Sequence, residues 1–477
     1  MHIYQSLAEV KNALATGKIS CRRLVSEYLE RIEQNRHLNA YLEVWGDEAL
    51  EQAKTIDEKI KQGKAGRLAG MVIAIKDNIC YKGHKVSASS KILEDFVSLY
   101  SSTVVKRLLA EDAIIIGRTN CDEFAMGSST EKSAYTKTLN PHDTSRVPGG
   151  SSGGSAVAVA AGLALAALGS DTGGSIRQPA SFCGVVGIKP SYGRVSRYGL
   201  IAYASSFDEI GTFTNNIEDC ASLLEVISGK DEYDSTLKQA DAPAYCKELK
   251  DVNVKKLKIA FIKESLEMEG LDPEIKKAVE DILALLKKQG HIVEPVSFPY
   301  LDYAVATYYV LTTAEASSNL SRFAGINYGY RSPQAVGVES TFKKTRTEGF
   351  GKEVKRRIML GTFVLSAGYY DAYYARGQKV RRVFTDKINS ILSEYDLVIL
   401  PTTPGTAFKF GQNDLDPVKM YLEDIFTVTA PITGLPAISL PLGKHSNGLP
   451  FGIQLMARKY DELTLLAFSD YLMNMKA

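Results

Sequence analysis

Apolar and polar positions repeat along this chain with two different spacings, and the changes between them predict its elements. Near the N-terminus, Ser6 to Glu9 has the form of a helix-capping box, and apolar residues follow it at helical spacing. The same spacing predicts a second helix after Ser20 and a third over residues 47–62. We therefore expect residues 1–66 to form a helical segment that packs on the rest of the protein.

From residue 67 onward, short continuous apolar runs alternate with helical patterns. Runs such as MVIAI at 71–75, AIIIG at 113–117 and LKIAFI at 257–262 predict strands, because a strand buried on both faces carries no polar side. Runs of the same kind stand at 291–296, 396–404, 436–443 and 451–457, and the segment at 182–199 predicts a further strand and turn. A tyrosine-rich region over residues 303–393 is expected to be helical. This alternation predicts an α/β protein with a mixed sheet.

The composition limits the classes of function. Of 477 residues, 45% are hydrophobic and 23% are charged, which is typical of a globular protein. The 57 basic and 55 acidic residues form no long block of either sign, so nothing indicates a surface for nucleic acid or membrane. The six cysteines lack the spacing of a metal site or a disulfide framework. Because neither a signal peptide nor a membrane-spanning run is recognisable, we expect a cytoplasmic protein.

Two loops rich in glycine and serine, GGSSGGS at 149–155 and SDTGGS at 170–175, are the candidates for chemistry. Neither contains the lysine of a phosphate-binding loop. GGSSG matches the GxSxG nucleophile elbow with Ser151 at its centre, but an elbow follows a strand and needs a later histidine. The residues before it show no strand pattern, and His291 and His445 stand in ordinary surroundings. A purely structural role, in which the glycines permit tight turns, explains one such loop adequately. It explains two such loops, with serines in both, less well.

A serine activated by a lysine is the remaining chemistry, and it is a known variant of the serine triad. An exposed lysine has a pKa of about 10.4, so keeping it neutral at pH 7 costs about 4.6 kcal/mol. Burial lowers a lysine pKa by about 3 to 5, which is the size required. Lys76 directly follows the apolar run MVIAI and is the best candidate for such a base. Either serine loop could hold the nucleophile.

The motif IAIKDN at 73–78 and the segment GGSSGGSAVAVAAGLALAALGSDTGGSIRQPA resemble the motifs of the amidase signature family. The spacing agrees as well, since 24 positions separate Ser151 from Ser175. The resemblance implies that Ser175 is the nucleophile, that Lys76 is the base, and that Ser151 relays the proton between them. It also implies a cis peptide bond before Ser151.

For the remainder of the loop, the resemblance implies an oxyanion hole of backbone N–H groups at Thr172, Gly173 and Gly174. Glycines suit this place, because a side chain would obstruct the approach of a substrate to the amides. We expect Asp171 and Arg177 to support the loop. For the fold, the resemblance implies a large, mixed, twisted sheet covered by helices on both faces, within one domain over residues 67–477.

Segments outside these motifs, among them CDEFAMGSSTEKSAY and YLEDIFTV, resemble one branch of the family, the glutaminase subunits of tRNA-dependent amidotransferases. The implied substrate is glutamine, whose two charges require opposite partners. By the resemblance, Arg357 holds the α-carboxylate and Asp424 the α-ammonium, while Tyr309 and Ser128 lie beside the side-chain amide. Arg356 and Tyr308 adjoin two of these positions, so the register between neighbours stays open.

This branch implies two partner subunits as well. The larger one, a tRNA-binding and ATP-using B subunit, would use the ammonia to convert Glu-tRNA(Gln) to Gln-tRNA(Gln), and a small C subunit would complete a heterotrimer. ATP and magnesium are then expected on the partner, with no cofactor or metal in this chain. Two alternatives remain open. One is a stand-alone amidase that acts on an aryl or aliphatic amide, and the other is a catalytically silent scaffold of an RNA-linked assembly.

Overall fold

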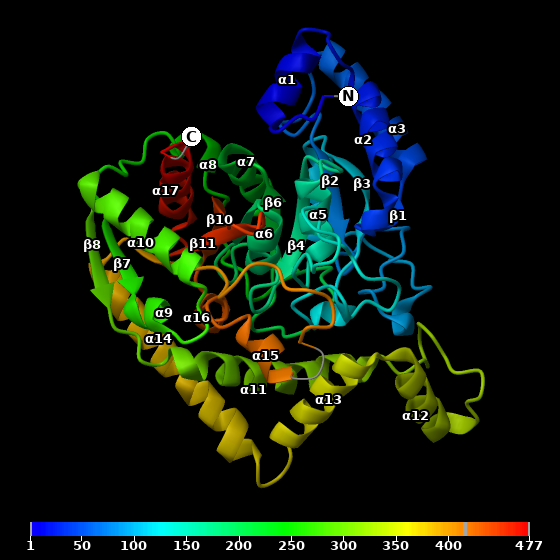
Figure 1. The fold of residues 1–477 in the computed structure, drawn as a ribbon. Coiled ribbons are helices and arrows are strands. Elements are labelled where there is room, and N and C mark those ends of the chain that lie inside the picture. The colour runs from blue at the N-terminus through cyan, green and yellow to red at the C-terminus, as the bar shows by residue number, and fades with distance from the viewer. Residues whose placement is uncertain (1, 414–416, 476–477) are drawn as a thin grey trace.

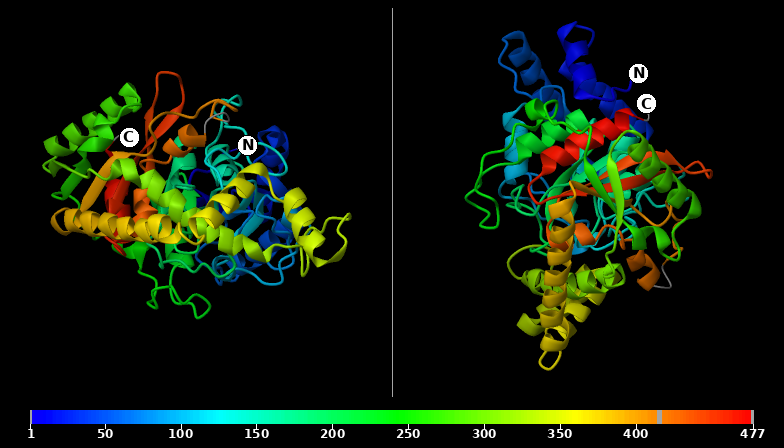
Figure 2. Two further views of the ribbon diagram at one scale, coloured as in Figure 1. Left: turned by 90° about the horizontal axis from the view of Figure 1, so that it is seen from below. Right: turned by 90° about the vertical axis from the view of Figure 1, so that its left-hand side faces the viewer.

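A single eleven-stranded sheet runs through the computed structural model, which describes residues 2–413 and 417–475 (Figure 1). The strand order is β1-β3-β2-β4-β6-β5-β10-β11-β9-β7-β8, and parallel and antiparallel pairs both occur. Helices cover both faces, as the views in Figure 2 show. The expected α/β fold with a mixed sheet is therefore confirmed. The strands are β1 Tyr41–Val44, β2 Val72–Lys76, β3 Ile114–Thr119, β4 Ala166–Asp171, β5 Val186–Lys189, β6 Glu209–Thr214, β7 Lys258–Ile262, β8 Ile292–Val296, β9 Leu397–Pro401, β10 Ala437–Lys444 and β11 Pro450–Ala457.

The helices follow the amphipathic stretches of the sequence. Ser6 caps the first one as predicted, because its side chain accepts a hydrogen bond from the N–H of Glu9 at 3.1 Å. The α-helices are α1 Leu7–Ala15, α2 Cys21–Gln34, α3 Gly46–Lys61, α4 Thr103–Ala110, α5 Gly153–Ala160, α6 Arg177–Cys183, α7 Ile217–Ile227, α8 Tyr245–Glu248, α9 Lys263–Glu267, α10 Pro273–Lys288, α11 Leu301–Asn319, α12 Gly337–Gly349, α13 Lys352–Val364, α14 Arg376–Glu394, α15 Pro417–Leu422, α16 Thr429–Thr433 and α17 Glu462–Asn474.

Three strands were not predicted. Residues 1–66 contain the three expected helices, but they also contribute β1, which pairs antiparallel with β3 at the edge of the sheet. Strand β6 joins β4 and β5 by antiparallel pairing. The long apolar run between the two glycine loops also divides into a helix, α5, and a strand, β4.

The central parallel strands set the position of the candidate site. Strand β2 lies between β3 and β4 and is parallel to both, with Lys76 paired to Thr119 and Ile75 paired to Leu168. All residues of β2, β3 and β4 are buried, which explains their continuous apolar sequences. Since parallel strands end at the same edge of a sheet, Lys76 and the loop after β4 lie together there.

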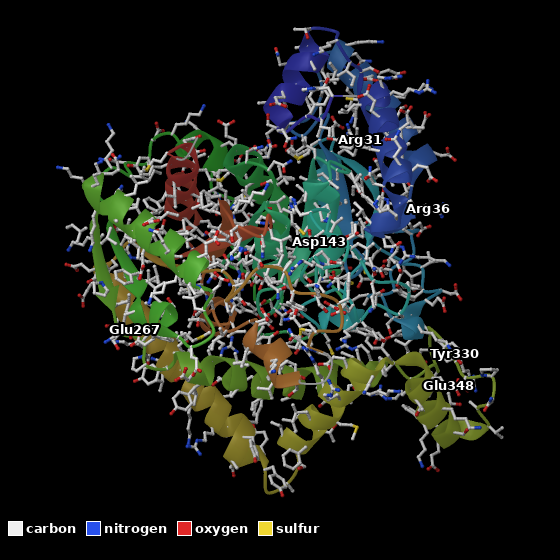
Figure 3. The ribbon with its side chains drawn as sticks, viewed as in Figure 1. Arg31, Arg36, Asp143, Glu267, Tyr330 and Glu348 are labelled. Carbon is white, nitrogen blue, oxygen red and sulfur yellow. The ribbon has the colours of Figure 1, made fainter. Side chains whose placement is uncertain are left out.

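The tyrosine-rich region after β8 is helical, as predicted. Helices α11 and α13 pack side by side, and a π-helix over Tyr370–Ala375 connects the end of α13 to α14. In Figure 1 the hairpin of α13 and α14 projects away from the sheet, opposite the two termini. Side chains fill the interior around the sheet (Figure 3), and beside α12 the Tyr330 hydroxyl donates to Glu348 at 2.6 Å.

Two further observations concern the whole described chain. Within residues 2–413 and 417–475, no helix combines the length and the apolar character that crossing a bilayer requires. All six cysteines are free thiols, and only Cys246 is exposed.

Candidate active site

Lys76 ends β2 with its ammonium group among serine hydroxyls. Its Nζ atom lies 2.7 Å from Oγ of Ser151, 2.9 Å from Oγ of Ser152 and 2.9 Å from Oγ of Ser170. The side chain is completely buried. A neutral lysine has two N–H donors and one lone pair, so this environment can accept both donors and still leave the lone pair for one serine proton.

Burial changes the protonation of this lysine. Removal from water lowers the pKa of Lys76 from 10.5 to about 8, although the nearby carboxylates of Asp122, Asp171 and Asp208 partly oppose the effect. Because no carboxylate of the described residues pairs directly with the ammonium, desolvation outweighs these charges. A lysine with this pKa can take up a proton near neutral pH, which is what a general base requires.

Ser151 lies in the turn before α5, and the peptide bond between Gly150 and Ser151 is cis. Its carbonyl accepts a hydrogen bond from the N–H of Asp122 at 3.1 Å, and the N–H of Gly150 donates to the side chain of Gln178 at 2.9 Å. The chain before this turn forms no strand, so the turn is not the strand-to-helix elbow that GGSSG matches by sequence alone.

Ser175 lies in the loop that follows β4, with only 7% of its surface exposed. The N–H of Ser152 donates to its carbonyl at 3.2 Å, which ties the two serine loops together. The hydroxyl of Ser175 makes no hydrogen bond to any of the residues that the structure describes. Lys76 and Ser151 are therefore in hydrogen-bond contact, while the contact between Ser151 and Ser175 that the expected relay needs is not formed.

A buried ion pair shapes the backbone around Ser175. Asp171 accepts hydrogen bonds from the N–H of Gly174 at 2.8 Å and from the N–H of Ile176 at 3.2 Å. Its carboxylate also pairs with Arg177 at 2.9 Å, and both side chains are fully buried. Burial alone would raise the pKa of Asp171, but the charge of Arg177 outweighs it and holds the pKa below its ordinary value.

This clamp changes the expected oxyanion hole. Because Gly174 already donates to Asp171, its N–H is not available to a substrate. Thr172 uses its hydroxyl to bind Asp208 at 2.7 Å. Among the described residues, the backbone N–H groups of Thr172, Gly173 and Ser175 have no acceptor. The loop thus offers three backbone amides, of which those of Gly173 and Ser175 lie on either side of the N–H of Gly174 that Asp171 occupies.

The four residues expected to bind glutamine lie together. Oδ2 of Asp424 accepts hydrogen bonds from the hydroxyls of Ser128 at 2.8 Å and Tyr309 at 3.3 Å. The guanidinium of Arg357 lies 5.0 Å from the centre of the Tyr309 ring. Burial raises the pKa of Asp424 from 3.8 to about 7, which the hydrogen bond from Ser128 and the charge of Arg357 only partly oppose.

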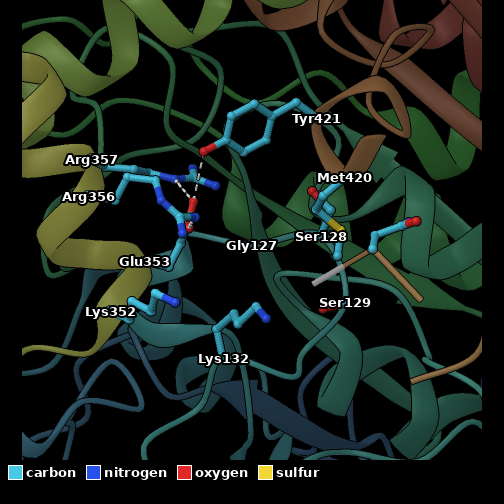
Figure 4. Close-up of a pocket in the computed structure, with 11 residues that line it drawn as sticks. Gly127, Ser128, Ser129, Lys132, Lys352, Glu353, Arg356, Arg357, Met420 and Tyr421 are labelled. Carbon is cyan, nitrogen blue, oxygen red and sulfur yellow. Dashed lines mark hydrogen bonds and ion pairs between the residues drawn. The ribbon is translucent and has the colours of Figure 1, made fainter. Parts of the chain in front are cut away.

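Arg357 projects from α13 into the wall of a cavity of about 360 Å³ (Figure 4). It donates to Glu353 at 2.9 Å and to the hydroxyl of Tyr203 at 2.9 Å. Burial would lower the pKa of Arg357, but the surrounding tyrosines and Glu353 raise it well above its ordinary value. The cavity is lined by Gly127, Ser128, Ser129, Lys132, Lys352, Glu353, Arg356, Arg357, Asn413, Met420 and Tyr421.

The neighbouring residues occupy different places. Arg356 also lines the cavity and pairs with Glu353, but its side chain is 40% exposed, against 4% for Arg357. Tyr309 contacts Asp424, whereas Tyr308 lies against the loop of Ser175, where a Cβ added to Gly173 would stand 2.6 Å from the Tyr308 hydroxyl. Both tyrosines are therefore part of the site.

Several groups at the site were not singled out from the sequence. Ser170 contacts Lys76, and Asp122 orders the loop that carries Ser128 by accepting from the N–H of Thr130 at 2.8 Å. The pairing of Glu353 with Arg357 could have been recognised, because the two residues are four positions apart on one helix. The contact of Ser170 depends on the pairing of β2 with β4, which no local pattern specifies.

Comparison with known proteins places the chain in a family. The sequence pattern of the amidase family, described as Amidase, matches residues 23–466. A protein of Chlorobium limicola, named as the A subunit of glutamyl-tRNA(Gln) amidotransferase, is 50% identical over 468 residues, which cover 98% of this chain and 98% of the relative. The chain therefore belongs to the amidase family.

Solved structures agree with this assignment. The crystal structure of the glutamyl-tRNA(Gln) amidotransferase A subunit from Thermotoga maritima has a TM-score of 0.79 and 43% identity, and the match covers 96% of this chain and 93% of that one. The peptide amidase from Stenotrophomonas maltophilia has a TM-score of 0.81 and 27% identity, and the match covers 98% of this chain and 96% of that one.

Proposed function

We propose that this chain is the glutaminase subunit of a tRNA-dependent amidotransferase, and that it hydrolyses glutamine to glutamate and ammonia. The arrangement of Asp424, Tyr309 and Arg357 carries the proposal. Tyr309 lies between the two charged groups, with its hydroxyl on Asp424 and its ring beside Arg357. Two buried and opposite charges that do not pair directly suit a small zwitterion, because each can hold one end of an amino acid.

The proposed reaction begins at Ser175. Its Oγ attacks the side-chain carboxamide carbon while its proton passes through Ser151 to the lone pair of Lys76. The developing oxyanion accepts hydrogen bonds from the N–H groups of Gly173 and Ser175, and one such donor contributes about 2.7 to 4 kcal/mol. The C–N bond then breaks, and the relay returns the proton to the departing ammonia. Water attacks the acyl enzyme by the same route and releases glutamate.

The proposed partners follow from the relatives. Those that match almost the whole chain at about half identity carry the name of the A subunit of glutamyl-tRNA(Gln) amidotransferase. We infer that the ammonia goes to a tRNA-binding B subunit, which uses ATP and magnesium to convert Glu-tRNA(Gln) to Gln-tRNA(Gln), and that a small C subunit joins them in a heterotrimer. The nearly balanced charge of this chain, +2, supports a division of labour in which another subunit binds the tRNA.

The test is to follow ammonia release from glutamine by the purified chain, alone and with the B and C subunits. Ser175→Ala is the inactive control. We expect release at least in the complex, and its absence under both conditions would refute the proposal. An uncharged aliphatic amide, assayed in parallel with glutamine, distinguishes a glutaminase from a stand-alone amidase. A glutaminase should prefer glutamine, and Asp424→Asn should remove that preference. Full tRNA-dependent activity of a Ser175→Ala complex supplied with glutamine would instead indicate a scaffold.

A further inference from the structure

A buried threonine lies between the nucleophile loop and the turn that carries Asp424. Thr427 is completely inaccessible, and its hydroxyl stands 2.6 Å from the carbonyl oxygen of Gly173 and 3.0 Å from that of Asp424. The N–H of Thr427 donates to the same Asp424 carbonyl at 3.0 Å, and its own carbonyl accepts from Arg177 at 2.7 Å. Thr427 thus contacts both halves of the site without lining the cavity of Figure 4.

The contact with Gly173 completes the fixation of one peptide group. The carbonyl of the Gly173–Gly174 peptide accepts from Thr427, and the N–H of the same peptide donates to Asp171 at 2.8 Å. Because a peptide unit is rigid and planar, two hydrogen bonds at its opposite ends fix its rotation. The unpaired N–H groups of Gly173 and Ser175 lie in the adjoining peptide units, so their directions depend on this fixed plane.

Packing at Gly174 keeps the threonine close. A Cβ on Gly174 would stand 2.2 Å from the Thr427 hydroxyl, and Gly174 has a φ of +134°, which L side chains rarely adopt. The loop therefore approaches Thr427 as closely as a backbone without a side chain allows. A hydroxyl at this position can reach the Gly173 carbonyl, whereas a methyl group of the same size would leave that buried acceptor without its donor.

We propose that Thr427 is a positioning residue, which holds the two oxyanion-binding N–H groups in place and couples them to the turn of Asp424. A hydroxyl has one hydrogen, and here it donates to Gly173, the nearer acceptor. The N–H of Thr427 is hydrogen-bonded to the Asp424 carbonyl. A displacement of the turn that carries Asp424 therefore moves the Thr427 hydroxyl away from the Gly173 carbonyl. The positioning role rests on the amidase chemistry, and the coupling rests on the proposed ammonium subsite at Asp424.

Three variants test this role with glutamine as the substrate. Thr427→Val removes the hydroxyl while keeping the shape, and we expect kcat to fall about tenfold or more with a smaller change in KM. Thr427→Ser keeps the hydroxyl and should restore kcat to within about threefold of the wild type. Thr429→Val is the matched control, because Thr429 is equally buried but its hydroxyl has no partner among the described residues. It should retain the wild-type kcat.

A fluorophosphonate probes the loop without glutamine. Oγ of Ser175 forms a bond to phosphorus, the P–F bond breaks, fluoride leaves, and Lys76 takes up the serine proton through Ser151. The phosphoryl oxygen then occupies the oxyanion position. We expect the rate of modification, followed by mass spectrometry, to fall in Thr427→Val about as much as kcat does, and to recover in Thr427→Ser.

The outcomes distinguish the two proposals. A wild type that is modified at Ser175 but releases no ammonia from glutamine contradicts the glutaminase function, and the fluorophosphonate rates still decide the role of Thr427. An unchanged modification rate in Thr427→Val overturns the inference, even where the thermal midpoint falls, since that pattern belongs to a purely structural residue. The inference is also overturned if Thr429→Val lowers the modification rate as much as Thr427→Val does.

Discussion

Replacing Lys76 by methionine should abolish a pH dependence that this lysine imposes on catalysis. Burial lowers its pKa from 10.5 to about 8. About one molecule in eleven is then neutral at pH 7, against about one in three thousand for a lysine that keeps its ordinary pKa. The active population is larger by about 300-fold, which corresponds to about 3 kcal/mol. Since the neutral form increases with pH, the reaction rate should rise as the pH rises.

The assay is the pH profile of kcat/KM for glutamine, together with the profile of Ser175 modification by a fluorophosphonate, which does not require binding of an ammonium group. For the wild type, the modification rate should rise by about tenfold per pH unit below about 8 and level off above it. The value of kcat/KM should rise more steeply below about 7, because Asp424 is protonated there as well. In Lys76→Met, kcat/KM and the modification rate should both fall by about 1,000-fold or more. The rise of the pH profile with its midpoint near 8 should disappear.

A second buried lysine provides the control. Lys189 is also completely inaccessible, and burial lowers its pKa to about 8, but its ammonium donates to the carbonyl of Pro190 at 2.6 Å and contacts no serine among the described residues. Lys189→Met should keep the rise of the pH profile near 8. If the rise of the pH profile near 8 remains in Lys76→Met, or if it disappears only in Lys189→Met, then Lys76 is not the base.

Four further predictions concern recognition and stability. Asp424→Asn should raise KM for glutamine about 10- to 100-fold, because a charge-assisted hydrogen bond contributes about 1.5 to 3 kcal/mol. In the wild type, KM should fall as the pH rises through about 7, where Asp424 becomes the carboxylate that binds an ammonium. Arg357→Gln should lower the free energy of unfolding in urea by about 1.5 to 3 kcal/mol, since Glu353 loses its buried partner but keeps Arg356 and the Tyr421 hydroxyl. Gly174→Ala should cost about 1 to 3 kcal/mol in the same assay, because of its φ and its contact with Thr427.

Each of these has a contrary result. A KM for glutamine that Asp424→Asn leaves unchanged, or that does not vary with pH, would remove Asp424 from the substrate site. Urea unfolding of Arg357→Gln at the wild-type midpoint would mean that Arg356 alone compensates the charge of Glu353. A Gly174→Ala chain that unfolds like the wild type would show that the loop can move away from Thr427.

The sequence predicted the buried strands well, because their signal is local. The runs before Lys76 and at 113–117 are continuous and apolar, and both became central parallel strands. Strand β6, with the sequence EIGTFT, has no such run, and it is ordered by antiparallel pairing on both of its edges. The apolar run after Ser152 carries no local signal that separates α5 from β4, since small apolar residues fit a helix and a buried strand equally well.

The site was predictable only where a motif carries it. The contact between Lys76 and Ser151 joins residues 75 positions apart, so it could be expected only from the family motifs. The commitment of the Gly174 N–H to Asp171 could not be expected, because it depends on the direction of one peptide plane. Orientation of this kind is set by packing across the sheet, and composition and spacing do not specify it.

The order of the site residues along the chain has a consequence for protein engineering. The residues proposed to break the amide bond all lie before residue 180, whereas those proposed to hold the charged ends of the substrate mostly come from α11, α13 and the turn before α16. A chimera could therefore exchange α11 to α13 for the same segment of another amidase, changing the amide that is accepted while retaining the machinery that cleaves it. Such an exchange leaves Asp424 and Thr427 in place, and Thr427 is where the two parts meet.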